Sequence, residues 1–227
     1  MNEYTTDEMH TISQTEALPF EHTKGFHPLY IFPLLYILSI YLLPAYLSIK
    51  IEGVDLTFLL FLPFAFGVLN IIAAVKFCRP ENRIIMLNAT VLVKYAMIPF
   101  FIIGGFIVVA AFFLSFIPVP FMIFLGPAFV IFGNVYGWFV LAFEAPYTIS
   151  YLRLSLKSNT LSKAMLIVHA ILQFFFFVDV IDVMFLTLKA RKWKKLTLTL
   201  IVLCVISALV LLILIIWKAT EIFLNAS

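Results

Sequence analysis

Apolar runs long enough to cross a bilayer as an α-helix recur along this chain. The hydrocarbon core of a membrane requires about 20 apolar residues per helical crossing, and several segments reach that length. Hydrophobic residues make up 64% of the 227 residues, charged residues make up only 12%, and Phe occurs 26 times. A soluble globule of this size could not bury so much apolar surface, whereas lipid solvates it directly. We therefore expect an all-α integral membrane protein.

About six transmembrane helices are predicted, and the Pro and Gly residues inside several of them are expected to introduce kinks. The runs cover residues 29–49, 56–77, 84–116, 121–145, 161–188 and 196–217. Residues 1–27 are polar and acidic, so we expect an N-terminal tail there rather than a signal peptide. Residues 28–227 are then a single transmembrane helical domain.

Two stretches are longer than one crossing needs. In the first stretch, residues 84–94 are interpreted as an interfacial segment that leads into a crossing at 95–116. The second stretch is 121–156, and it has two interpretations.

In one interpretation of this second stretch, a single crossing is followed by an interfacial helix. In the other, two short crossings at 119–134 and 137–153 raise the total to seven helices. We favour six, because the extra short helix would hold Glu144 and Pro146 in the middle of its crossing.

Basic residues cluster beside the apolar runs in three places. The clusters are Lys76, Arg79 and Arg83; then Arg153, Lys157 and Lys163; then Lys189, Arg191, Lys192, Lys194 and Lys195. Lys and Arg near helix ends favour the cytoplasmic side. With the first cluster in the cytoplasm, six crossings place the third cluster outside the cell, and seven crossings place the second cluster outside. Neither count therefore puts all three basic clusters on the cytoplasmic side. Both counts place the N-terminus in the cytoplasm.

The lipid bilayer is the first partner that this charge pattern predicts. Basic clusters next to apolar runs favour anionic headgroups and not nucleic acid. The abundance of Ile, Phe and Lys favours the cytoplasmic membrane of a bacterium.

Lys94 and Glu144 are the first candidates for a functional site, because an ionised side chain inside a membrane costs about 2.5–3.5 kcal/mol on insertion scales. Lys94 lies eleven residues beyond Arg83, and Glu144 lies nine residues before Arg153. With six crossings the two side chains have similar depth, and we expect a buried ion pair. The alternative is that Lys94 extends to the headgroups from an interfacial segment.

Asp179 and Asp182 are spaced i, i+3 and therefore share one face of a helix. Two carboxylates on one face can bind a cation, share a proton or pair with a base. His169 and Gln173 share a second face, about 130° away on one continuous helix. We therefore do not expect one small ligand to contact all four, and interhelical hydrogen bonding is the favoured role for His169.

Three asparagines lie within apolar runs. Asn134 falls between Gly133 and Gly137, in a stretch that we interpret as locally broken and open to a substrate. Asn70 and Asn88 are secondary candidates, and contacts between helices are the favoured role for both.

Function is constrained mainly by what the chain lacks. We find no motif for nucleotide binding, hydrolysis or metal binding, and we expect no cofactor and no metal. The buried charges favour transport of a small solute or ion, or a transporter-accessory subunit, with a small-molecule ligand. Six helices are few for a transporter, which predicts a homodimer or a larger membrane partner. The alternatives are a lipid-modifying membrane enzyme and a non-catalytic assembly subunit.

Overall fold

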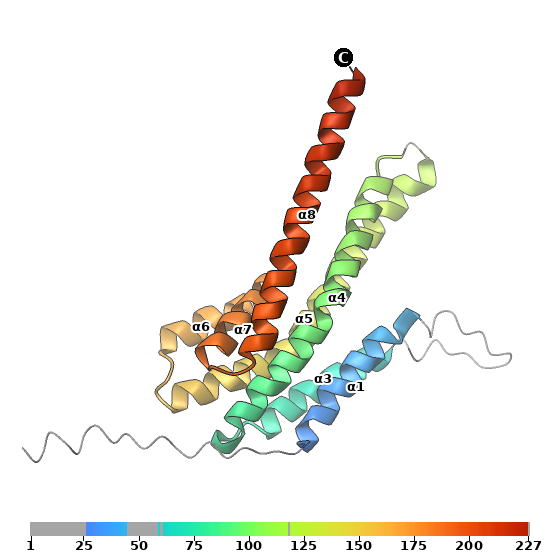
Figure 1. Ribbon diagram of the computed structural model, residues 1–227. Helices are drawn as coiled ribbons and strands as arrows, with labels where there is room; N and C mark the ends of the chain where they lie inside the picture. The colour runs from blue at the N-terminus through green and yellow to red at the C-terminus, as the bar shows by residue number, and fades with distance from the viewer. Residues whose placement is uncertain (1–25, 45–58, 60, 118, 227) are drawn as a thin grey trace, which may run out of the picture.

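The computed structural model describes residues 26–44, 59, 61–117 and 119–226, and for part of the last helix it describes the backbone alone. These residues form helices and no strand, which confirms the all-helical prediction. Almost all of the predicted N-terminal tail lies outside the described residues. The elements are η1 (Pro28–Tyr30), α1 (Ile31–Tyr41), α3 (Leu62–Lys76), η3 (Pro80–Asn82), α4 (Arg83–Leu114), α5 (Pro120–Lys157), α6 (Lys163–Leu172), α7 (Val178–Lys189) and α8 (Lys194–Ala226) (Figure 1).

Two long helices, α4 and α5, run side by side and form the frame of the molecule (Figure 1). They contain 32 and 38 residues and are joined by a short connection, so they are antiparallel. Pro80–Leu114 and Pro120–Lys157 are the two runs in the described part of the chain that are long and apolar enough to cross a membrane. We call α4 and α5 the long hairpin.

Each long run forms one continuous helix. Helix α4 continues from Arg83 through Pro99 to Leu114, so the interfacial segment predicted at 84–94 and the crossing predicted at 95–116 belong to the same helix. Likewise α5 is continuous across 134–137, which excludes two separate helices in that stretch. Gly and Pro favour a break but do not force one, since neighbouring helices can stabilise a long helix that contains them.

The single helix predicted over 161–188 is also wrong. The structure has two short helices there, α6 with ten residues and α7 with twelve, which fold back against each other. Phe177, at the start of α7, adopts a left-handed backbone with φ 64°. No Gly or Pro occurs between residues 161 and 188, so the usual signals for a break are absent. We call α6 and α7 the short hairpin.

Helices α1 and α3 pack against the long hairpin near the end where α4 begins (Figure 1). The Tyr36 hydroxyl donates a hydrogen bond to the carbonyl of Val140 at 3.3 Å. Gly67 in α3 lies directly beneath the ring of Phe143, and a Cβ at this position would lie 2.4 Å from the ring. Helix α1 covers the N-terminal part of the predicted run 29–49, and α3 covers the C-terminal part of the predicted run 56–77. Residues 45–58 between them lie outside the described part.

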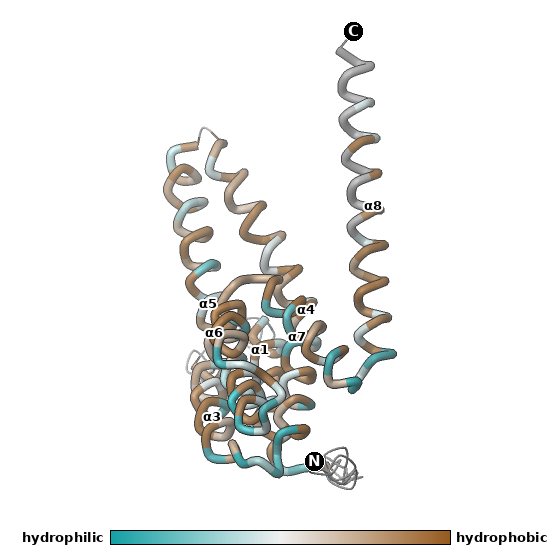
Figure 2. The backbone as a smooth tube through the Cα atoms, turned by 90° about the vertical axis from the view of Figure 1, so that its left-hand side faces the viewer, coloured by the Kyte–Doolittle hydropathy of each residue, from teal (hydrophilic) through white to brown (hydrophobic). Residues whose placement is uncertain are grey.

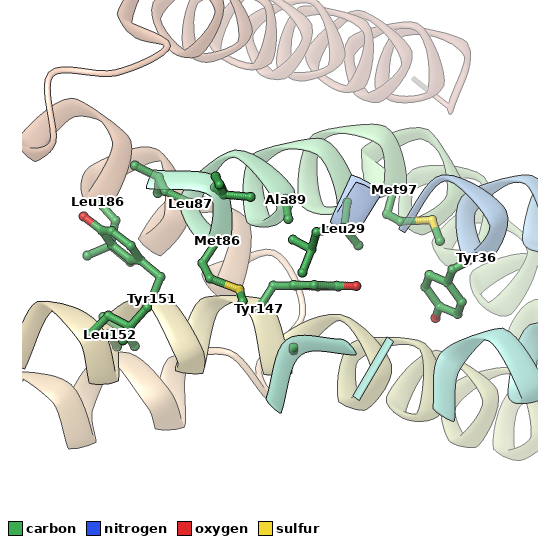
Figure 3. Close-up of a cluster of buried hydrophobic side chains, with 14 of the residues drawn as sticks. Leu29, Tyr36, Met86, Leu87, Ala89, Met97, Tyr147, Tyr151, Leu152 and Leu186 are labelled. Atoms are coloured by element: carbon green, nitrogen blue, oxygen red, sulfur yellow. The ribbon is translucent and has the colours of Figure 1, made fainter. Parts of the chain in front are cut away.

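Buried apolar side chains gather at this end of the long hairpin. The cluster joins η1, α1, α3, α4, α5 and α7, and Figure 3 labels Leu29, Tyr36, Met86, Leu87, Ala89, Met97, Tyr147, Tyr151, Leu152 and Leu186. The other end of the long hairpin is different, since large apolar side chains there are exposed, such as Phe106, Phe113 and Phe124. Helix α8, which contains the predicted run 196–217, begins with Lys194 and Lys195 and contacts α4 through Thr197 in its first turn. Beyond that turn it stands apart from the long hairpin, and its coloured part is mostly apolar (Figure 2).

Candidate functional site

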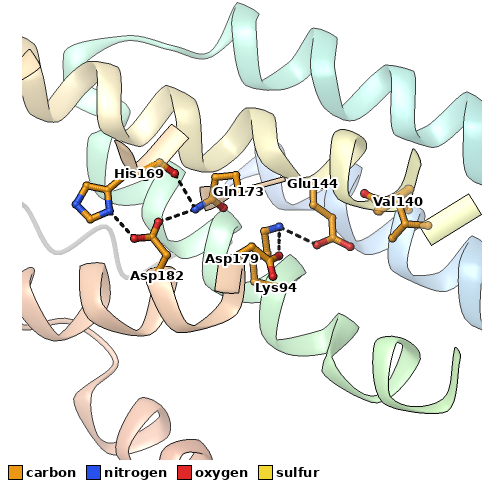
Figure 4. A network of polar contacts seen from close by, with 8 residues as sticks. Lys94, Val140, Glu144, His169, Gln173, Asp179 and Asp182 are labelled. Carbon is orange, nitrogen blue, oxygen red and sulfur yellow. Dashed lines mark hydrogen bonds and ion pairs between the residues drawn. The ribbon is translucent and has the colours of Figure 1, made fainter. Parts of the chain in front are cut away.

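Lys94 lies between two carboxylates in the interior of the molecule. Its Nζ donates a hydrogen bond to Asp179 Oδ2 at 2.6 Å and lies 3.2 Å from Glu144 Oε2 (Figure 4). All three side chains are fully buried. The contact between Lys94 and Glu144 that the sequence predicts is thus present, and Asp179 is the stronger partner because its geometry satisfies a hydrogen bond.

The register of the long hairpin brings Lys94 and Glu144 to the same level. Lys94 is eleven residues from the start of α4, and Glu144 is thirteen residues from the end of α5. Arg83 Nη1 donates a 2.6 Å hydrogen bond to Ser158 Oγ, which aligns these two helix ends. Asp179 arrives from α7, where it occupies the first turn and is favoured there by the helix dipole.

Asp182, one turn after Asp179 on α7, links α7 to α6 within the short hairpin. Its carboxylate contacts His169 Nδ1 through Oδ1 and accepts a 2.7 Å hydrogen bond from Gln173 Nε2 through Oδ2 (Figure 4). Lys94, Glu144, His169, Gln173, Asp179 and Asp182 are all buried, and we call these six residues the polar cluster.

The predicted separation of His169 and Gln173 from the aspartates is therefore wrong. It assumed one continuous helix, whereas the break between α6 and α7 turns the two polar faces toward each other. Asp179 and Asp182 do share the inward face of α7, as expected from their spacing. Asp179 contacts α4, and Asp182 contacts α6 and the residue that follows it.

The polar cluster contains more acceptors than donors. It has three carboxyl groups against one lysine and one histidine. Three buried oxygens have neither a hydrogen bond nor an ion pair: Oε1 of Glu144, Oδ1 of Asp179 and Oε1 of Gln173. A buried acceptor without a donor costs about 1–3 kcal/mol, and more when it is charged. A proton or a positive charge at these oxygens would therefore stabilise the cluster.

The ionisable groups of the polar cluster decide which chemistry it can perform. Among the described residues, no group of three or more His, Cys, Asp and Glu side chains is arranged to hold a metal ion. Burial raises the pKa of the Asp182 carboxyl, and the contacts with His169 and Gln173 act in the opposite direction. The cluster thus combines carboxyl groups and an imidazole, groups that can donate and accept protons.

The three asparagine candidates lie outside the polar cluster. Asn134 is exposed, and its Nδ2 donates to the carbonyl of Val130 within the same helix, so the locally broken site expected there is wrong. Asn70 accepts a 3.0 Å hydrogen bond from the Tyr147 hydroxyl. Asn88 donates to the Tyr30 hydroxyl at 3.1 Å and accepts from Trp193. Asn70 and Asn88 thus join separate elements, the role that the sequence favours.

A group of hydroxyls beside the polar cluster was not predicted. The Tyr95 hydroxyl is 2.8 Å from Thr197 Oγ1, and Thr197 is 3.1 Å from Thr187 Oγ1. These contacts connect α4, α7 and the first turn of α8, immediately next to Lys94. The one available signal was the presence of two threonines in largely apolar helices, which is common in membrane proteins and carries little information.

Comparison with known proteins places the chain in a family but supplies no function. No curated protein and no solved structure matches it. One family model matches residues 26–195, a range that contains the whole polar cluster and ends just after the start of α8. This range covers most of the chain, and the protein therefore belongs to DUF6652, a family of unknown function.

Proposed function

We propose that the protein is an integral membrane protein that transports a small solute or ion, or serves a transporter as its accessory subunit. In this proposal the polar cluster is the site that takes up a proton or another small cation. One observation carries the proposal: Lys94 lies between Glu144 and Asp179, while three neighbouring buried oxygens have no hydrogen-bond or ion-pair partner.

Membrane insertion is supported by the exposed apolar surface of the long hairpin. From Lys94 to Ser115, α4 rises about 32 Å at 1.5 Å per residue, close to the thickness of the hydrocarbon core. The side chains on this stretch include Ile103, Phe106 and Phe113, each more than half exposed. Water would solvate such a surface poorly, whereas acyl chains solvate it well. The abundance of Ile, Phe and Lys in the chain supports the cytoplasmic membrane of a bacterium as its location.

A proton or small cation is the occupant that fits the surplus charge. With all three carboxyl groups ionised, Lys94 compensates one of them and a protonated His169 compensates a second. The remaining negative charge is buried, and an uncompensated buried charge is strongly unfavourable. A proton shared by Glu144 and Asp179 removes that charge without needing a cavity. A cationic or amine-bearing solute would remove it and also donate to the three unpaired oxygens.

Proteoliposomes test this proposal. The full chain is reconstituted with a pH-sensitive dye inside, and an interior-negative potential is imposed with potassium and valinomycin. We expect vesicles with the wild-type protein to acidify faster than empty vesicles. Vesicles with Glu144→Gln or Asp179→Asn should acidify no faster than empty ones. Asn134→Ala is the matched control and should keep the wild-type rate, because Asn134 is exposed and its amide donates to a carbonyl of its own helix.

The same vesicles are then loaded with gradients of sodium or methylammonium in place of the potential. A flux that requires Glu144 and Asp179 under any of these conditions supports the proposal. If Glu144→Gln and Asp179→Asn vesicles match the wild type under all of them, the cluster has a packing role and the transport proposal fails.

A second candidate function, a membrane enzyme that acts on lipids, is favoured by one contact. His169 lies against Asp182, an arrangement that orients an imidazole for acid–base catalysis. The test is hydrolysis of phospholipid in mixed micelles. Activity that His169→Gln abolishes would favour the enzyme, and the transport assay above separates the two functions.

A further inference from the structure

The three basic clusters, far apart in sequence, meet at one end of the molecule. The hydrogen bond from Arg83 to Ser158 joins the first cluster, where α4 begins, to the second cluster, where α5 ends. Trp193 Nε1 donates to Asn88 Oδ1 at 2.8 Å, which brings the third cluster, at residues 189–195, beside the second turn of α4.

The chain returns to this end after each excursion. The start of α1 lies here, since Tyr30 accepts a hydrogen bond from Asn88 and His27 contacts the ring of Phe77 just after α3. The long hairpin leaves this end and returns to it. The short hairpin starts and finishes here as well, between the second and third basic clusters.

The opposite end of the long hairpin carries no charge. Residues 95–143 contain no Asp, Glu, Lys or Arg, and this range includes the connection between α4 and α5. The charged residues that flank this stretch in sequence are the buried Lys94 and Glu144. The described hairpin is therefore strongly asymmetric along its axis, with basic residues at one end and apolar residues at the other.

The basic side chains at the charged end border exposed apolar surface. Lys76 and Arg79 are exposed and follow Val75, which is 65% exposed on α3. Lys194 and Lys195 are exposed and precede Leu198, which is 59% exposed on α8. Cationic side chains directly beside an apolar surface match the boundary between headgroups and acyl chains, where Trp residues such as Trp193 also concentrate.

We infer that the three basic clusters form one basic collar that binds anionic phospholipid headgroups and holds this end at the cytoplasmic leaflet. The short hairpin stays on that side and does not cross. The chain then crosses through α4, α5 and α8, while α1 and α3, with 11 and 15 residues, lead away from the basic end and back to it. This arrangement places all three clusters inside, which neither six nor seven crossings achieves. The inference rests on the proposed membrane insertion, but not on the transport role.

Single cysteines and a membrane-impermeant maleimide test the orientation. Cys78 and Cys204 are first replaced by Ala, and Phe116→Cys, Ala164→Cys or Lys194→Cys is then introduced. All three positions are exposed. In intact cells we expect labelling of Phe116→Cys alone, and labelling of the other two only after permeabilisation. Labelling of Lys194→Cys or Ala164→Cys from outside would overturn the inference.

Nanodiscs of defined composition test the headgroups. The melting temperature of the wild type should be higher in phosphatidylglycerol than in phosphatidylcholine, and salt should shrink this difference because it screens exposed charge. The difference should be smaller for the double variant Lys194→Gln/Lys195→Gln. Equal melting in both lipids, or a stabilisation by an oligonucleotide that exceeds the lipid effect, would contradict the collar. Release of the chain from membranes by alkaline carbonate would instead refute insertion, and with it the proposed function.

Discussion

At the scale of single residues, the free energy of unfolding depends strongly on the charge of Lys94 in the polar cluster. It supplies the positive charge that two buried carboxylates from different helices share. Removing one member of a buried charge pair leaves an uncompensated charge, which costs far more than the pair contributes in the native protein.

Lys94→Met should therefore lower stability by about 3–5 kcal/mol and lower the melting temperature in detergent markedly. Asn134→Ala serves as the control and should stay within about 0.5 kcal/mol of the wild type, because Asn134 is exposed and its amide donates to a carbonyl of its own helix. The double variant Lys94→Met/Asp179→Asn should regain part of the loss, because it removes one of the two stranded carboxylates. A melting temperature for Lys94→Met equal to that of the wild type would show that the three groups are not electrostatically coupled.

Much of the polar cluster was predictable at this scale. Lys94, Glu144 and Asp179 stand out because charge inside an apolar run is costly, and the similar distances of Lys94 and Glu144 from their basic flanks predict their contact. The contacts of Asp182 with His169 and Gln173 were not predictable from helical periodicity. They depend on a chain reversal that no local residue signals.

At the scale of the elements, close packing of the long hairpin depends on glycines in α5. A Cβ at Gly126 would lie 2.2 Å from Ser115 Oγ and 2.8 Å from the carbonyl oxygen of Ala111. Gly105 in α4 has no heavy atom within 4 Å of its Cβ position. A side chain would thus collide with α4 at Gly126, whereas there is room for one at Gly105.

Gly126→Ala should destabilise the protein by about 1–3 kcal/mol, because backbone atoms of α4 would have to move. Gly105→Ala should have no adverse effect and can add up to about 1 kcal/mol through reduced backbone entropy of the unfolded chain. Thermal unfolding in detergent, followed by helical circular dichroism, compares the two. A neutral Gly126→Ala would mean that the hairpin can separate at this level without cost.

The reversal within the short hairpin is strained at one residue. Phe177 holds a left-handed backbone, which costs a non-glycine residue about 1–2 kcal/mol. Phe177→Gly should therefore raise the melting temperature. Phe175→Gly is the matched control, since Phe175 is similarly exposed, at 53% against 57%, but has no left-handed backbone. That variant should melt at or below the wild-type temperature, and an equal rise in both variants would rule out strain as the cause.

The predicted elements succeeded where apolar length alone decides and failed where tertiary contacts decide. The long apolar runs at 84–116 and 121–156 contain one continuous helix each, although Gly and Pro suggested interruptions. The run at 161–188 lacks such residues and is nevertheless broken. Its break is compensated by the ion pair of Asp179 with α4 and by the contacts of Asp182 with α6, which only the folded chain contains.

At the scale of the whole molecule, the surface divides into a basic end and a large apolar remainder. The apolar part includes α8 and the far half of the long hairpin, where many Phe, Ile and Val side chains are exposed. Such a surface exceeds by far what a soluble monomer tolerates.

The chain should therefore remain in the membrane pellet after washing with alkaline carbonate and should enter solution only with detergent. A peripheral protein held by the basic collar alone would leave the pellet at high salt, because its attachment is electrostatic. Immunoblotting of pellet and supernatant distinguishes these outcomes, and full recovery in the salt wash would refute insertion.

The sharing of Lys94 between two helices has a mechanical consequence. The ammonium group of Lys94 lies on α4, and its partner Glu144 lies on α5. Its other partner, Asp179, lies on α7 in the short hairpin. Neutralising Asp179 would leave Lys94 to Glu144 alone and release one tether of the short hairpin, while neutralising Glu144 would leave that tether in place. Protonation of Asp179 would thus weaken the attachment of the short hairpin to α4, whereas protonation of Glu144 would not.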